Sequence, residues 1–212
     1  SELVSRLKQS SNYDALSFSS NSLNLKFIST QKVPSALFVK SINLVLEDAN
    51  ISVARVNSLK NGDEISYGIL ALKSGGIDPN LLNFTLSKSG FKIMGFDRLD
   101  GNLALYLDAK NMSLNASKVK DTTQTPLVKS GGVYIVDVAG ASSLSIISNE
   151  PNKWVPLVRI YDKNLNQIDL KRENEIKTNY TINLANDAKY ALISDNSDIT
   201  NIKNEIIIKL IK

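Results

Sequence analysis

The hydrophobic pattern of this chain changes in character at about its midpoint. Apolar residues in the first half recur both at helical spacing and in alternating runs, whereas only short alternating runs remain in the second half. Residues 111–126, which separate the halves, are rich in Ser, Asn, Lys, Thr and Gln, as is typical of a domain border. We therefore predict an α+β domain over residues 1–116, a linker over 117–126 and an antiparallel β-sandwich over 127–212.

The first domain is expected to contain a short N-terminal helix followed by two longer helices and five strands. Leu3, Val4 and Leu7 indicate the short helix, and apolar spacing predicts the longer ones over 36–47 and, after the N-cap Asp78, over 79–88. Alternation and turn residues predict strands over 23–27, 51–56, 64–72, 91–96 and 103–107, with Asn61-Gly62 and Asp100-Gly101 as hairpin turns. The order β-α-β-β-α-β-β predicts a ferredoxin-like sheet with both longer helices on one face.

The second domain is expected to consist of short strands without helices. Its β-prone runs, each bounded by turn-forming residues, cover 133–138, 143–147, 157–161, 180–184, 190–193 and 205–211. Short strands in this density are typical of a sandwich of two sheets.

Three segments of the second half carry a resemblance to a known family. They are YIVDVAGASSLSI at 134–146, PLVRIYD at 156–162 and YALI at 190–193. In these segments the chain resembles the pre-peptidase C-terminal type of β-sandwich found in exported bacterial proteins. The resemblance implies an accessory, non-catalytic module outside the cytoplasm, and it carries over no site residue.

The chain contains neither cysteine nor histidine. Their absence excludes disulfides, zinc sites that use sulfur, and nucleophiles activated by an imidazole. Catalysis would have to rest on carboxylates, Lys or Tyr, and the closest local acid pairs are Glu47 with Asp48 and Glu173 with Glu175. Both pairs lie beside expected turns or helix ends, where exposed charge is ordinary. We therefore expect no enzyme, no cofactor and no metal site, with a carboxylate-dependent hydrolase as one alternative.

The positive charge of the chain is spread too thinly to predict nucleic-acid binding. The net charge is +4, but Arg occurs only at positions 6, 55, 98, 159 and 172, and no two of these adjoin. Nucleic-acid readers usually concentrate Arg, because its planar fork binds phosphates and bases bidentately. No apolar run approaches the roughly 20 residues that span a bilayer, so we expect a chain that does not span a membrane.

Two sites stand out as candidates for modification or binding. Asp48-Ala49-Asn50-Ile51-Ser52 matches the extended bacterial N-glycosylation pattern, so Asn50 is a candidate acceptor in a periplasm that holds the transferase. Trp154, with Tyr161 near it in sequence, is a candidate aromatic surface for a sugar ring or a partner peptide, although a lone Trp in a sandwich is more often core.

Together these features predict a non-catalytic structural or interaction protein of the bacterial cell envelope. An abundance of Asn, Lys, Ile and Ser suggests a low-GC bacterium, and the chain is expected to be periplasmic or extracellular after removal of a leader. We expect a periplasmic part of a flagellar, pilus or secretion assembly whose partners are other envelope proteins. A carbohydrate-binding or adhesin-like module is the second hypothesis, and the hydrolase is the third.

Overall fold

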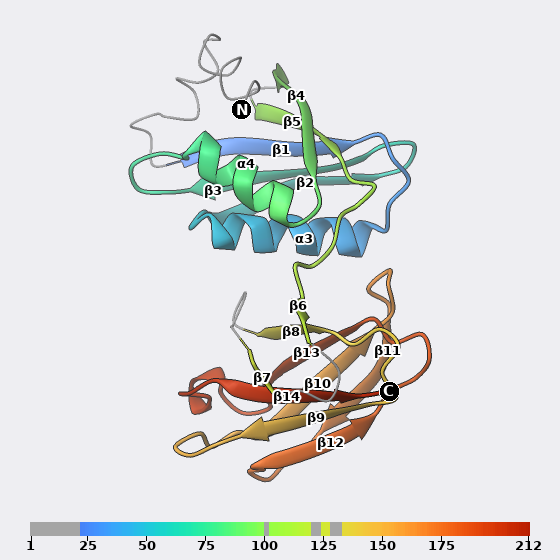
Figure 1. The fold of residues 1–212 in the computed structure, drawn as a ribbon. Helices are drawn as coiled ribbons and strands as arrows, with labels where there is room; N and C mark the ends of the chain where they lie inside the picture. The colour runs from blue at the N-terminus through green and yellow to red at the C-terminus, as the bar shows by residue number, and fades with distance from the viewer. Residues whose placement is uncertain (1–21, 100–101, 120–123, 128–132) are drawn as a thin grey trace. The chain divides into compact units, whose positions relative to one another are not determined.

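The computed structural model describes residues 22–99, 102–119, 124–127 and 133–212. The chain divides into two compact units, Ser1–Leu114 and Asn115–Lys212, which are coloured from blue to green and from yellow to red in Figure 1. The helix predicted around Leu3 and the turn predicted at Asp100-Gly101 lie outside the described residues.

Unit 1 is a mixed sheet with two helices. In chain order its elements are β1 (Ser22–Ser29), α3 (Ser35–Asp48), β2 (Ser52–Asn61), β3 (Ile65–Leu72), α4 (Pro79–Lys88), β4 (Lys92–Leu99) and β5 (Asn102–Asp108). The predicted α+β class and its β-α-β-β-α-β-β order are confirmed. The Asp78 carboxylate caps α4 by accepting a hydrogen bond from the Asn80 amide at 2.8 Å, as the sequence predicts.

The last hairpin modifies the ferredoxin-like plan. The strand order is β2-β3-β1-β5-β4, with β1 antiparallel to β3 and parallel to β5. In the ferredoxin-like plan, the strand that follows the second helix lies beside β1. Here that strand, β4, occupies the sheet edge, and β5 returns to fill the place beside β1.

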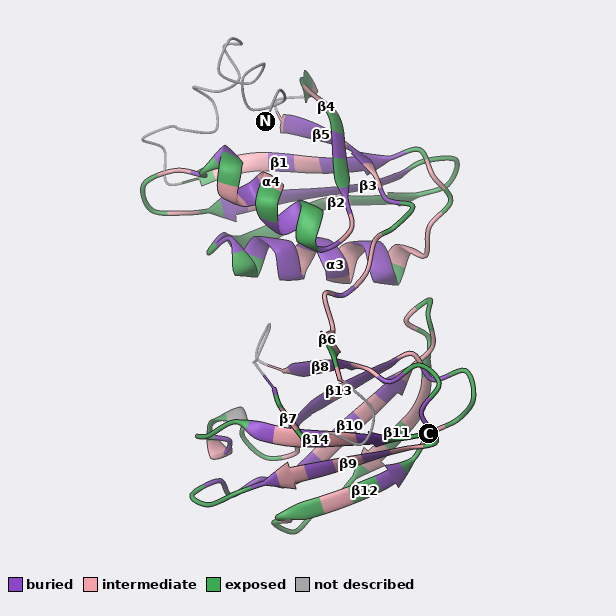
Figure 2. Cartoon of the chain, in the orientation of Figure 1, coloured by how far each residue is buried: buried purple, intermediate pink, exposed green. Residues whose placement is uncertain are grey.

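The core of unit 1 lies between one face of the sheet and both helices. Alternate strand residues such as Phe27, Ile69 and Leu105 belong to one buried cluster that also contains Phe38 of α3 and Leu82 of α4. A single cluster shared by both helices places them on the same face, as predicted. Figure 2 shows the resulting alternation of buried and exposed residues along α4.

The opposite face of the sheet holds a buried hydroxyl, that of Ser66. This residue alternates with the core residues Ile65 and Tyr67 on β3, and its fully buried Oγ has no hydrogen-bond partner among the residues that the structure describes. We expect Ser66→Ala to leave the free energy of unfolding unchanged or to raise it by about 1 kcal/mol, because it removes an uncompensated polar group. Urea unfolding monitored by circular dichroism measures the difference.

Ser41→Ala is the matched control for this prediction. Ser41 is equally buried, but its Oγ donates to the Ser113 carbonyl at 3.2 Å. Its loss should therefore cost about 1 kcal/mol. Equal losses in the two variants would contradict the assignment of Ser66 as unpaired.

Unit 2 is built from two sheets. Its elements are β6 (Ser117–Lys118), β7 (Thr125–Pro126), β8 (Tyr134–Asp137), β9 (Ser143–Ser148), β10 (Pro156–Tyr161), β11 (Gln167–Arg172), β12 (Asn179–Asn183), β13 (Tyr190–Asp195), the 3-10 helix η1 (Ile199–Asn201) and β14 (Ile206–Ile211). The sheet orders are β11-β10-β13-β8-β6 and β12-β9-β14-β7. The two sheets bury a shared apolar cluster between them, which is the predicted sandwich.

The segment predicted as a linker contributes to both sheets. β6 pairs in parallel with β8, and β7 pairs with β14. The border between the units therefore falls at residues 114/115, and the described parts of 117–126 belong to unit 2. β11 is not predicted from the sequence, because its residues QIDLKR are mostly charged or amide-bearing and it occupies a sheet edge where such residues are common.

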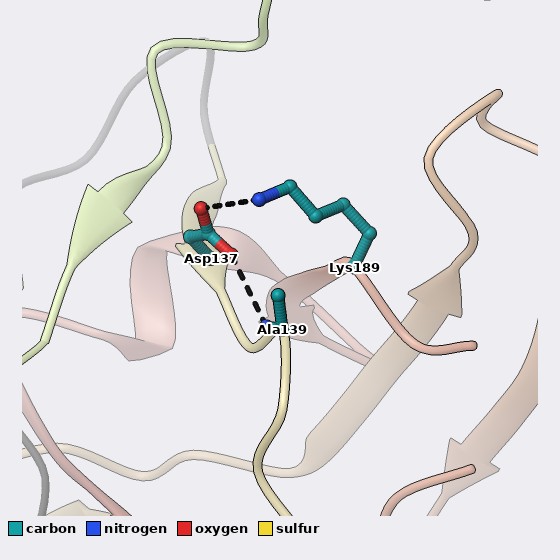
Figure 3. A network of polar contacts seen from close by, with 3 residues as sticks. All are labelled: Asp137, Ala139 and Lys189. Carbon is teal, nitrogen blue, oxygen red and sulfur yellow. Dashed lines mark hydrogen bonds and ion pairs between the residues drawn. The ribbon is translucent and has the colours of Figure 1, made fainter. Parts of the chain in front are cut away.

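In the five-stranded sheet of unit 2, an ion pair joins the end of β8 to the residue before β13. Lys189 Nζ lies 2.7 Å from Asp137 Oδ2, and the Ala139 amide donates to Asp137 Oδ1 at 3.1 Å (Figure 3). The Asp137 carboxylate thus fixes the turn into β9 and the strand that pairs with β8. These contacts give both charged residues a structural role.

Candidate binding groove on unit 1

β2 is the edge strand on one side of the unit 1 sheet. Within the described residues it pairs only with β3, and nine of its ten residues are exposed. An edge strand presents unpaired amide and carbonyl groups along one side, which can pair with another chain. Within the described residues, β2 therefore offers one side of its backbone for pairing.

Two β-bulges place an apolar stripe on β2. The register with β3 shifts between Val53 and Arg55 and again between Val56 and Ser58. Each bulge inserts an extra residue, so side chains three positions apart face the same side of the sheet. The stripe consists of Val53, Val56 and Leu59, which are 37%, 52% and 53% exposed.

This apolar stripe lies on the face that carries the helices. Val53, Val56 and Leu59 pair with Ala71, Ile69 and Tyr67 respectively. All three β3 partners belong to the core cluster beneath the helices. The stripe therefore lies on the same face as α3, at an edge strand that remains largely uncovered.

A groove runs between α3 and the first half of β2. Its volume is about 640 Å³. The lining residues come from α3, from the corner after it, from β2 and from β3; they are Asn43, Glu47, Asn50, Ile51, Ser52, Val53, Val56 and Tyr67. The groove combines apolar walls with a few polar groups, which is the usual make-up of a binding site.

Tyr67 and Asn43 form the polar contact of the groove. The Tyr67 hydroxyl donates to Asn43 Oδ1 at 3.0 Å, joining β3 to α3. Burial raises the pKa of Tyr67, and the hydrogen bond to Asn43 opposes that shift only in part. Tyr67 therefore stays neutral at physiological pH and remains a hydrogen-bond donor.

The groove carries a negative charge at the C-terminal end of α3. Glu47 is the one charged side chain among the described lining residues, and the last turn of α3 contains no basic residue. The helix macrodipole disfavours carboxylates at this position. Lys73 donates to the Ala49 carbonyl and offsets part of that charge. Arg55 and Lys60 of β2 lie on the opposite face of the sheet, as their register with β3 shows.

Asn50, the predicted glycosylation acceptor, is exposed at the mouth of this groove. It has a φ of 54°, and the amides of Asn50 and Ile51 donate to the Glu47 and Leu46 carbonyls at 2.8 and 2.7 Å. This is the Schellman arrangement, in which asparagine tolerates the left-handed position after a helix. The helix end therefore provides a structural reason for asparagine here, and modification of Asn50 stays a prediction.

Of the two interpretations of Trp154, core residue and aromatic surface, its burial supports the core and rules out the surface. Trp154 is 0% exposed, its Nε1 donates to the Ser194 carbonyl at 2.8 Å, and Tyr180 packs edge-on against it. The indole therefore belongs to the sandwich core and offers no platform for a sugar ring. Tyr161 lies half-buried on the outward side of β10, so the structure does not bring it together with Trp154 as one surface.

Several acidic residues of unit 2 have structural partners. Asp195 is buried, and its carboxylate accepts hydrogen bonds from the amides of Val155, Ser197 and Asp198. Glu175 forms an exposed ion pair with Lys177 at 3.3 Å. Across the described residues, no group of three or more acidic side chains could hold a metal ion.

Sequence patterns single out Glu47 and Asn50 among the lining residues, but not the apolar stripe of this groove. By alternation, Val53, Val56 and Leu59 belong to an ordinary hairpin strand or its turn. Their spacing of three is the signal that could have revealed the bulges, since an unbroken strand would place Val56 on the opposite face from Val53 and Leu59.

Within the described residues, no helix is both long and apolar enough to cross a bilayer. No protein-family model and no curated protein matches this sequence.

Proposed function

We propose that this chain is a non-catalytic interaction protein of the bacterial cell envelope, working as a periplasmic part of a larger assembly such as a flagellar, pilus or secretion machine. The observation that carries the proposal is the β2 edge with its exposed apolar stripe beside the groove. Exposed apolar patches on a soluble domain mark interaction sites. The resemblance of the second half to sandwiches of exported bacterial proteins supports the location.

The chemistry of the groove favours binding over catalysis. Its described lining contains one carboxylate, Glu47, whereas glycoside hydrolysis uses two acids on either side of the scissile bond. Asn43 and the neutral Tyr67 satisfy each other in a hydrogen bond. Carbohydrate binding loses its best candidate residue, since Trp154 is buried.

Site-specific photo-crosslinking in the cells that produce the protein tests this proposal. A benzophenone amino acid at position 56 should form a covalent adduct with an envelope protein identifiable by mass spectrometry, and fractionation should recover the chain from the periplasm. Val56 tolerates the change because its side chain is 52% exposed.

Two further exposed positions outside the groove are probed in the same way. Phe84 on α4 and Leu170 on β11 are 64% and 45% exposed, and neither belongs to the groove. A chain that fractionates with the cytoplasm, or that forms no envelope adduct from any of the three positions, would contradict the proposed function.

A further inference from the structure

The groove and the apolar stripe form one elongated surface. The groove ends near Val56, and the stripe continues along β2 to Leu59. From Val53 to Leu59 the strand extends for about 20 Å. A surface that follows one strand for this distance, bordered by a helix on one side and a strand edge on the other, is suited to a polypeptide rather than a small compound.

We propose that this surface binds an extended segment of another protein, with apolar side chains facing the stripe and a Lys or Arg facing Glu47. The inference rests on the proposed interaction function and names the class of partner. The segment pairs with the free edge of β2 and inserts apolar side chains between β2 and α3. This is strand addition, in which main-chain bonds supply affinity and pockets for side chains supply specificity.

The negative charge of Glu47 is the reason to expect a basic residue in the partner. Glu47 is exposed, and no cation is present among the described lining residues of the groove. The carbonyl end of α3 adds a partial negative charge nearby. The ammonium group of Lys73 contacts the Ala49 carbonyl at this helix end, which leaves the Glu47 carboxylate open to solvent. A cationic side chain of the partner therefore meets an exposed carboxylate at the end of the groove.

The bulges disfavour a second copy of this chain as the occupant. Antiparallel pairing of two β2 strands would bring the two bulges of each copy into one ladder. Each bulge leaves a residue unpaired and disrupts the ladder locally. A regular partner strand meets only the bulges of β2, so a different chain makes the better ladder.

A displayed library of random twelve-residue peptides tests the inference with the full chain as bait. The expected result is enrichment of peptides with alternating apolar residues and at least one Lys or Arg. Val56→Lys should weaken binding of an enriched peptide at least about tenfold, because it places a charge in the stripe. Glu47→Lys, used as bait in a second selection, should shift the enriched charge from Lys or Arg to Asp or Glu.

Met94→Lys is the matched control. Met94 is 60% exposed on β4, the strand at the other edge of the same sheet, so binding should change by less than about twofold. Circular dichroism melting verifies that all three variants fold.

Any one of three results would overturn the inference. The first is that the library yields no enriched peptide, and the second is that enriched peptides bind the Val56→Lys variant as tightly as the parent chain. The third is that sedimentation shows a dimer of the parent chain that the Val56→Lys substitution dissociates. The last result assigns the surface to a second copy. If the crosslinking gives an envelope adduct from position 170 but the peptide selection fails, this inference is refuted and the proposed function stands. If the chain binds the selected peptides but fractionates with the cytoplasm, only the proposed function is refuted.

Discussion

Trp154→Ala is expected to destabilise unit 2 by about 3–5 kcal/mol, the usual cost of truncating a fully buried Trp. The indole is 0% exposed, packs edge-on against Tyr180 at 6.3 Å between ring centroids, and donates to the Ser194 carbonyl. Its loss would leave a cavity and remove the hydrogen bond from the indole to the Ser194 carbonyl. Urea unfolding followed by the NMR amide resonances of unit 2 measures the loss. Tryptophan fluorescence cannot be used, because the variant lacks the only tryptophan of the chain.

Trp154→Phe separates the two contributions to that loss. Phenylalanine keeps much of the apolar volume but lacks the indole N–H that donates to the Ser194 carbonyl, so a smaller cost of about 1–3 kcal/mol is expected. A Trp154→Ala variant within about 1 kcal/mol of the parent chain would contradict the placement of the indole in the core.

Gly90→Ala is expected to destabilise unit 1 by about 2–5 kcal/mol. Gly90 follows α4 with a φ of 79°, and a left-handed backbone costs an L-residue about 1–2 kcal/mol. A Cβ at this position would also collide with the Asn111 carbonyl oxygen and lie 2.6 Å from its carbon. Displacing that backbone adds about 1–3 kcal/mol. Circular dichroism at 222 nm follows the loss, because both described α-helices lie in unit 1.

Gly75→Ala is the matched control for steric collision. Gly75 has the same φ of 79°, and no atom lies within 4 Å of the place that a Cβ would take. This variant should therefore show only the backbone cost of about 1–2 kcal/mol. Equal destabilisation by the two variants would show that the contact between Gly90 and Asn111 contributes nothing.

The sequence predicted most helices and strands of both units because their signals are local. Asp78 caps α4 through a hydrogen bond to an amide two residues away, and Gly90 ends the same helix within one turn. The alternation in β9 and β10 likewise matches their burial residue by residue. Neighbouring residues decide such features, so a pattern in a short window contains them.

The candidate site could not be predicted in the same way. The groove needs α3 and β3 packed beside β2, and the stripe exists only because bulges bring Val53, Val56 and Leu59 to one face. Trp154 is a candidate surface residue by sequence because a sequence does not show which aromatic side chain lies between the two sheets. In each case the deciding contact joins residues that are distant along the chain.

The sequence by itself determined the two-part organisation, the order of helices and strands in unit 1, and most strands of unit 2, since hydrophobic period and turn residues act over a few positions. Only the tertiary structure decided that β5 lies between β1 and β4, that β6 and β7 join the sandwich, and that β2 presents an apolar edge beside α3. Strand neighbours, register and bulges depend on which distant segments bury each other's apolar surface, and no local pattern records that choice.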